Sequence, residues 1–377
     1  MVASGPPKAF GASDTFGMFA LTPSMRPPLF STPLFLGAVL TALSSAACSG
    51  QSALCRFRGT VNAPENRTMR RNAMATGLGE FCKQMLTRSA PLAMVSGQAA
   101  TGRFFPTSCS QREADNGDLA VQFGGRGYTW TTLTKKVTFE MSGAVQYNQD
   151  FLVAPEKCDI YGYFRPRKVT SSDFKIGFVE QPAAQFVTQM SNMGTEFGKQ
   201  LVGDNLSKGF TVIMLEDGGQ DFGLGIIDLG KKPFHPLTVQ QKGRMPIENN
   251  RVEVHSNERD FVGPFTVEAE DSSIWITAQS DGGVPIDVMV MRKGEGDQSL
   301  RSYLEQAAIG PLTGTPIWAD VLQPAQVGFA RRVPVPPGMY YVVLDNSSQA
   351  GTVAPPVNLF DDRAALVDYA IQIGKNP

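Results

Sequence analysis

The side chains that most often carry catalysis are scarce in this sequence. Its two histidines, His235 and His255, belong to no H-E-x-x-H metal motif, and no G-x-S-x-G elbow of a serine hydrolase is present. Because hydrolytic mechanisms most often use histidine as the general base, they have no starting point here. We therefore predict that the protein has no catalytic residues and is not an enzyme.

Three glycine-containing segments deserve comparison with ion-binding loops. Glu216–Asp221 (EDGGQD) and Ser280–Asp287 (SDGGVPID) contain the oxygen ligands that calcium prefers, but neither has the spacing of an EF-hand. Since Asp-Gly pairs are common in tight turns, we predict turns at both places and neither a metal nor a cofactor. Gly124–Gly127 (GGRG) precedes a strand-like segment and not a helix, so we predict a hairpin turn there and no phosphate site.

The charge of the chain is balanced. Lys and Arg total 34 against 35 for Asp and Glu, which gives a net charge of -1. This composition leaves no electrostatic footprint for nucleic acid, which we exclude as a partner. One small basic cluster, Phe164–Lys168 (FRPRK), is typical of a strand edge protected by charge. The alternative is a contact with lipid headgroups or an anionic polymer.

An apolar segment near the amino terminus has the parts of a secretory signal. Arg26 supplies the positive charge, Leu34–Leu43 is apolar, and the small residues Ser44–Ala47 lead into Cys48. The sequence SSAAC resembles the lipobox of bacterial lipoproteins, in which the cysteine is lipidated and becomes the first mature residue. The resemblance implies a lipid anchor on Cys48 and, because Ser49 follows, attachment to the bacterial outer membrane with no transmembrane helix.

Alternatives to this leader remain open. Ser45 stands where the lipobox usually has leucine, so ordinary cleavage near Ala47 is one of them, and an uncleaved anchor is another. Residues 1–24 show no helical or strand period and precede a second methionine, Met25, that opens a normal signal. We interpret Met25 as the true start, with a long n-region of the signal as the alternative.

Four further cysteines lie in the first half of the chain, at Cys55, Cys82, Cys109 and Cys158. An even number in an exported protein indicates structural disulfides, and the absence of close pairs such as C-x-x-C argues against zinc. Four cysteines allow three connectivities. We favour the sequential one, Cys55 with Cys82 and Cys109 with Cys158.

The first domain is predicted to be an antiparallel sheet packed on a long helix. Apolar residues at helical spacing predict a helix over 68–86, and alternating segments from Leu119 to Glu180 predict about five strands, with Lys136 and Glu140 facing water. A second helix is predicted over 182–203, followed by two strands that complete the domain. Its apolar stripe consists of Phe186, Met190, Met193, Phe197 and Leu201.

A long apolar helix inside a curved sheet resembles, in architecture, the lipid-binding lipoproteins of the tubular lipid-binding type. That resemblance implies a hydrophobic ligand lying along the stripe, whose methionines and phenylalanines suit an adaptable pocket. The alternative is that the stripe is ordinary core.

The second domain is predicted to be a β-sandwich. Seven short strands follow one another from Arg251 onward, interrupted by one helix for which Asp297 is the predicted cap and Leu300, Tyr303, Leu304 and Ala307 the apolar face. The run Val335–Ser348 (VPPGMYYVVLDNSS) resembles the aromatic strand of bacterial prepeptidase C-terminal and related jelly-roll modules. Such modules bind or space other domains.

We therefore predict a mainly β (α+β) protein with four regions. Residues 1–47 are the leader and signal peptide, 48–66 the lipidated cysteine and tether, 67–232 the disulfide-bearing sheet with helices, and 233–377 the β-sandwich. The predicted function is that of a non-enzymatic envelope lipoprotein that binds a protein or glycan partner, or acts as a structural module. The alternative function is a carrier of lipid or another hydrophobic ligand.

Overall fold

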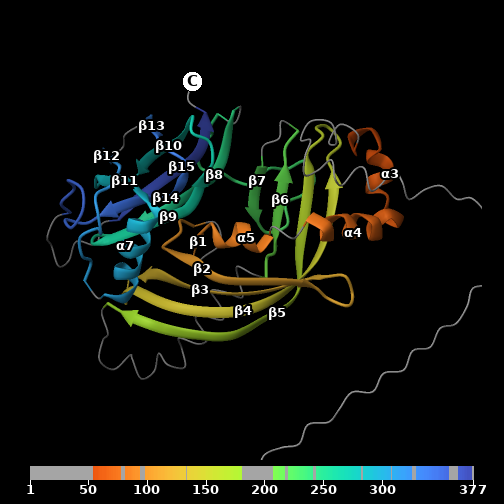
Figure 1. The fold of residues 1–377 in the computed structure, drawn as a ribbon, viewed down its shortest axis with the longest axis horizontal. Coiled ribbons are helices and arrows are strands. Elements are labelled where there is room, and N and C mark those ends of the chain that lie inside the picture. Colours follow the sequence, from red (N-terminus) through yellow and green to blue (C-terminus); the bar gives the residue numbers. More distant parts are fainter. Residues whose placement is uncertain are drawn as a thin grey trace, which may run out of the picture.

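The computed structural model describes residues 54–77, 81–93, 98–132, 134–180, 207–216, 220–240, 243–281, 283–306, 308–324, 328–355 and 364–375. The protein is mainly β: an antiparallel sheet of seven strands and a β-sandwich of eight, with short helices (Figure 1). The predicted class is therefore confirmed at this level. The stripe helix over 182–203 lies outside the described residues, as do Cys48 and the leader.

The seven-stranded sheet is a simple meander in which every strand pairs antiparallel with the next along the chain. Its strands are β1 (Ala90–Leu92), β2 (Gly102–Glu113), β3 (Leu119–Thr131), β4 (Lys135–Val153), β5 (Ile160–Val179), β6 (Phe210–Met214) and β7 (Gln220–Leu224). β6 pairs only with Ile160–Phe164 of the long β5, so the rest of that strand, including Arg165–Lys168 of the basic cluster, has no described strand partner on this side.

The prediction of about five strands between Leu119 and Glu180 is wrong, because three long strands span this range. β3 runs through the predicted turn at Gly124–Gly127, β4 through Gly143 and β5 through Ser171. At Ser142/Gly143, Gln146/Tyr147 and two further places the register shifts instead of the chain turning. Such bulges bend a strand while it stays paired. These glycines therefore lie at bends and close contacts within long strands, and not at turns between strands. The strand β2 was not predicted from the sequence.

Among the described residues, the helices before the sheet include α3 (Arg58–Asn62), the short 3-10 helix η1 (Pro64–Asn66), α4 (Arg67–Gly77) and α5 (Phe81–Leu86). The helix predicted over 68–86 is confirmed in the two parts that the structure describes. Met74, Phe81 and Met85 pack on an apolar face formed by Phe104, Phe123 and other residues of the sheet. Phe81 stacks on Phe164 and Phe210, with ring centroids 6.2 and 5.8 Å away. We call this side of the sheet the helix face.

The sandwich consists of two four-stranded sheets, ordered β13-β10-β15-β8 and β12-β11-β14-β9. Its strands are β8 (Arg244–Val254), β9 (Glu258–Val267), β10 (Ser272–Asp281), β11 (Ile286–Arg292), β12 (Trp318–Leu322), β13 (Phe329–Pro334), β14 (Gly338–Asn346) and β15 (Ala365–Lys375). Valine and isoleucine side chains from both sheets fill the space between them. This confirms the predicted β-sandwich, and β12 is the strand that was not predicted.

The helix of the sandwich, α7, spans Lys293–Glu305, so the predicted cap at Asp297 is wrong. Asp297 lies inside the helix, where its carboxylate pairs with Lys293 and accepts a hydrogen bond from Tyr341 at 2.8 Å. The predicted face is confirmed for Leu300, Tyr303 and Leu304, which are buried. Among the described residues, no helix has the length and apolar character needed to span a membrane.

The disulfides are Cys55–Cys158 and Cys82–Cys109, so all four cysteines are paired but the sequential connectivity is wrong. The pairing follows from how the helices dock. α5 lies over β2, which brings Cys82 to Cys109. The residues around α3 lie against the end of the β4–β5 hairpin, which brings Cys55 to Cys158. Disulfides of this kind are typical of proteins exported to an oxidising environment.

A buried arginine joins the seven-stranded sheet to the sandwich. Arg103 of β2 is 0% exposed and donates to both carboxylate oxygens of Asp260 in β9, at 2.8 and 2.7 Å. It also donates to Glu248 of β8 at 3.1 Å and to Tyr369 of β15 at 2.7 Å. Burial lowers the pKa of Arg103, but the carboxylates of Asp260 and Glu248 raise it more, so that it ends well above its usual value. The guanidinium therefore stays charged inside the protein.

Lys136 makes a second contact across this junction, which corrects the prediction that it faces water. Its ammonium donates to the carbonyls of Tyr303 and Gln306, at 3.0 and 3.1 Å, and lies 4.1 Å from the centre of the Tyr303 ring. A cation is stabilised at the carboxyl end of a helix, here α7. Lys136 is therefore buried because the start of β4 packs against the carboxyl end of α7 and does not face water.

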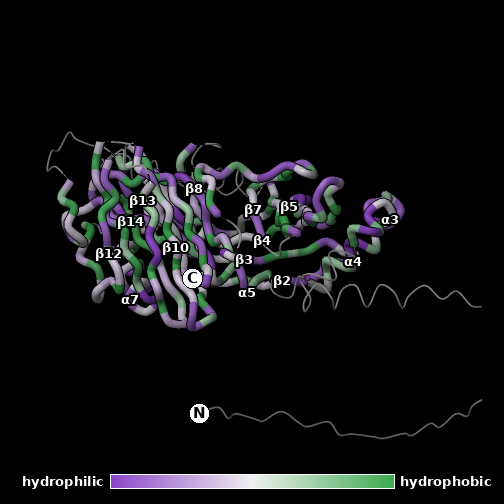
Figure 2. Tube along the Cα trace, turned by 90° about the horizontal axis from the view of Figure 1, so that it is seen from above, coloured by the Kyte–Doolittle hydropathy of each residue, from purple (hydrophilic) through white to green (hydrophobic). Residues whose placement is uncertain are grey.

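Aromatic rings fill the remainder of the junction. Tyr128 of β3 packs edge to face on Tyr303, with the ring centroids 5.1 Å apart. Trp130 stacks on His255, with the ring centroids 3.3 Å apart. The sheet and the sandwich thus share a continuous buried interface. Seen from above, the sandwich lies at one end of the long axis and α3 at the other (Figure 2).

Candidate functional site

The side of the sheet opposite the helix face bears mostly small and polar side chains that are exposed or half-buried. We call it the open face. Neighbouring strands place its residues in four rows, read from β2 to β5: Arg112, Ala120, Gln146 and Lys168; Ser110, Gln122, Ala144 and Thr170; Ser108, Gly124, Ser142 and Asp173; and, from β3 to β5, Arg126, Glu140 and Lys175. Strands lie about 4.8 Å apart, so a row of four spans roughly 14 Å.

The first two rows enclose a shallow groove of about 360 Å³, which we call the amide groove. Its centre is hollow because Ala120 and Ala144 occupy adjacent strands, whereas the amide side chains of Gln122 and Gln146 stand beside them. Arg112 and Lys168 supply positive charge at its two ends. The amide groove therefore offers hydrogen-bond donors and acceptors in the middle and cations at the rims.

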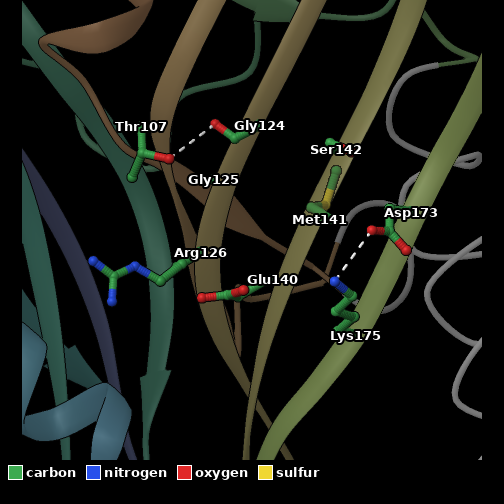
Figure 3. A pocket seen from close by; sticks show the side chains of 9 residues that line it. All are labelled: Thr107, Gly124, Gly125, Arg126, Glu140, Met141, Ser142, Asp173 and Lys175. Atoms are coloured by element: carbon green, nitrogen blue, oxygen red, sulfur yellow. Dashed lines mark hydrogen bonds and ion pairs between the residues drawn. The ribbon is translucent and has the colours of Figure 1, made fainter. Parts of the chain in front are cut away.

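The last two rows enclose a second groove of about 390 Å³, the charged groove (Figure 3). Gly124 and Ser142 keep its floor low. Arg126, Glu140 and Lys175 succeed one another on adjacent strands, so the sign of the charge alternates along the row. Lys175 lies 3.4 Å from Asp173. The Arg126 guanidinium also lies 3.6 Å from Glu305 of α7, at the border with the sandwich.

The glycines of the predicted hairpin turn lie in the middle of β3, where they allow close packing. A Cβ atom on Gly125 would meet the carbonyl oxygen of Phe105 at 2.3 Å, and one on Gly124 would meet the Ser108 hydroxyl at 2.8 Å. These contacts lie beside the bulge at Pro106/Ser108 in β2. Glycine is therefore required for β2 and β3 to approach each other at the charged groove.

The open face has the chemistry of binding. The residues that line the two grooves contribute amides, hydroxyls and charges of both signs, and none of these lining residues is aromatic or histidine. A partner would be held by hydrogen bonds and ion pairs spread over four strands, which suits an extended polar molecule such as a protein segment or a glycan. Among the described residues, no group of three or more His, Cys, Asp or Glu side chains is placed to hold a metal ion.

The histidines lie away from both grooves. His235 donates through Nε2 to the Asp221 carboxylate of β7 at 2.8 Å, and its Nδ1 lies 3.2 Å from the carbonyl oxygen of Asn249 in β8. The hydrogen bond to Asp221 raises the pKa of His235 above its ordinary value, although burial and Lys232 oppose the shift. His255 is buried against Trp130 and takes part in the junction.

The other candidate segments and residues are placed as follows. Glu216–Asp221 connects β6 to β7, and Ser280–Asp287 connects β10 to β11. Cys48 and the proposed ligand-lining residues Phe186, Met190, Met193, Phe197 and Leu201 lie outside the described residues. Reasoning from the sequence missed the open face, although the alternation of Ser, Gln and Ala along β2 to β4 is a signal for it. Reasoning from the sequence also missed the buried Arg103. The signal for it is a single charged residue directly before two phenylalanines, Phe104 and Phe105.

Comparison of the chain with protein-family models and with curated proteins finds no match.

Proposed function

We propose that this protein is a non-enzymatic lipoprotein of the bacterial cell envelope, anchored to the outer membrane through Cys48, and that it binds a protein or glycan partner on the open face. The observation that carries the proposal is the pair of grooves on a sheet face built from small and polar residues. Lipidation and the outer-membrane address rest on the SSAAC sequence and on Ser49. The two disulfides support export.

The physical reason for a binding role is the rigidity of the face. Binding costs less when the contact groups are already ordered before the partner arrives. In the middle of each groove, β3 and β4 are paired on both sides, and β2 packs under α5, whereas β5 pairs there with β4 alone. The junction around Arg103 fixes the sheet against the sandwich. Hydrogen-bonding groups held in rows at strand spacing favour a partner that is itself extended.

The test fills the amide groove with the Ala144→Tyr variant. Ala144 is half-buried on the open face, and tyrosine suits a strand position whose side chain can extend into solvent, so the fold is retained while the groove is blocked. A photoreactive amino acid at position 122 is used to cross-link protein partners in the producing cells, and sedimentation with purified peptidoglycan tests a glycan. We expect one of these signals in the wild type and a loss of at least about tenfold, equivalent to 1.4 kcal/mol, in Ala144→Tyr.

The matched control is Ala330→Tyr, which makes the same change at an exposed strand position of the sandwich and should keep the signal. A signal that survives in Ala144→Tyr, or the absence of both signals in the wild type, would refute binding on the open face. Native mass spectrometry of the exported protein distinguishes the alternative function, because a lipid that copurifies in stoichiometric amount would favour the carrier.

A further inference from the structure

The first described residues of the chain form a platform at the end of the molecule. Leu54 and Val61 pack against Phe151, Val153 and Ile160 of the β4–β5 hairpin. The side chain of Asn62 also donates to the carbonyl of Val153 at 2.8 Å and accepts from its amide at 2.9 Å. The Cys55–Cys158 disulfide closes the same contact covalently. This segment is therefore held firmly on the sheet.

One aromatic side chain on this platform is largely exposed. Phe57 is 61% exposed, although it lies between the disulfide and α3. Its neighbour Arg56 is also exposed, and Lys157 is exposed beside the disulfide on the hairpin. Two carboxylates, Glu65 and Glu156, are exposed nearby in the sequence. An exposed aromatic side chain on a segment that also carries exposed basic residues has the composition of a surface that inserts at a lipid interface.

The chain between Cys48 and the platform is short, which limits how far the platform can lie from the anchor. This step rests on the proposed function, in which Cys48 carries the lipid. Only residues 49–53 separate Cys48 from Leu54, so the chain between them reaches at most about 22 Å. The lipidated residue lies at the membrane, and the platform must lie within that distance of it. No other described part of the chain is tied to the anchor by so short a connection.

We propose that the α3 platform rests on the phospholipid surface, with the Phe57 ring inserted among the lipids and Arg56 and Lys157 facing the phosphate groups. α3 and the sandwich lie at opposite ends of the long axis (Figures 1 and 2). The sandwich therefore projects away from the membrane, and the open face lies along the side of the molecule where a partner can reach it.

The experiment places a tryptophan, as a fluorescent reporter, at position 57 of the platform and at position 234 as a control. Full-length lipidated protein carrying Phe57→Trp is reconstituted in vesicles of phosphatidylethanolamine and phosphatidylglycerol whose acyl chains are brominated, because bromine quenches tryptophan within the bilayer. Phe234→Trp is the matched control, since Phe234 is 87% exposed and lies next to His235 between the sheet and the sandwich. We expect quenching of the tryptophan added in the Phe57→Trp variant and none of that added in Phe234→Trp, measured against the wild-type signal.

The outcomes separate this inference from the proposed function. The mass of the amino-terminal peptide reports whether Cys48 is lipidated, and an unmodified cysteine would refute the anchor itself. A lipidated protein in which the Phe57→Trp variant is not quenched would overturn the docking of the platform and leave the lipoprotein assignment standing. Equal quenching of both variants would also overturn it, because the molecule would then lie flat on the membrane.

Discussion

His235 is a titratable residue at the contact between the sheet and the sandwich. Both of its ring nitrogens face hydrogen-bond acceptors, Asp221 at 2.8 Å and the carbonyl of Asn249 at 3.2 Å. Neutral imidazole has one N–H and can donate to only one of them, whereas imidazolium donates to both. The folded protein therefore favours the protonated form, which agrees with the raised pKa of His235. This contact ties β7 of the sheet to β8 of the sandwich.

We expect a pH-dependent contribution of His235 to stability. A raised folded pKa means that the contribution is complete below the unfolded value near 6.5 and is lost as the pH rises through the folded value. A hydrogen bond to a charged partner contributes about 1 to 2 kcal/mol at a partly exposed site. Urea denaturation at pH 5.5 and pH 8.5 should show that the stability difference between the wild type and His235→Gln shrinks at high pH. A difference independent of pH would contradict the protonated pair.

At the scale of elements, the disulfides fasten two different helical segments to the sheet. Cys55–Cys158 closes a loop with a sequence separation of 103 residues, and Cys82–Cys109 one with a separation of 27. The number of cysteines predicted disulfides, but the spacing along the chain favoured neighbours. The pairing depends instead on which helix docks on which strand, a tertiary event that the spacing does not contain.

Removing either disulfide should destabilise the protein, and the longer loop should cost more. The chain-entropy model predicts about 4.7 kcal/mol for Cys55→Ser with Cys158→Ser and about 3.6 kcal/mol for Cys82→Ser with Cys109→Ser. Urea denaturation of the two double variants under nonreducing conditions measures the difference. Peptide mapping without reduction checks the pairing itself. A larger loss for the shorter loop would show that packing of α5, and not loop entropy, dominates.

At the scale of the whole molecule, the junction around Arg103 decides how the two β-rich parts sit together. Asp260 and Glu248 lie on different strands of the sandwich, and the Arg103 guanidinium of the sheet binds both carboxylates. A buried charge without its partner is costly, so each of these groups depends on the others. The open face keeps its position relative to the sandwich for this reason.

We expect Arg103→Met to lower the free energy of unfolding by about 3 to 5 kcal/mol, because the buried Asp260 and the partly buried Glu248 lose their cation. The control is Arg331→Met, whose arginine pairs with Asp320 at a half-exposed site and should cost less than about 1 kcal/mol. Urea denaturation followed by fluorescence measures both. The wild type should unfold in a single transition and Arg103→Met in two. Equal losses in the two variants would contradict a junction that depends on the buried arginine.

The sequence by itself determined the fold class, the existence of the sandwich and the helical segments around Arg67–Leu86, because these follow from local periodicity in which each strand or helix turns one face to the core. Only the tertiary structure decided the disulfide pairing, the buried Lys136, the Arg103 junction and the role of Gly124 and Gly125 inside a strand. Each of these depends on residues far apart in the chain. A charged residue or a glycine can have the same neighbours in the sequence whether it lies in a turn, on a solvent-exposed face or at a packed interface. Only the contacts between elements distinguish these three environments.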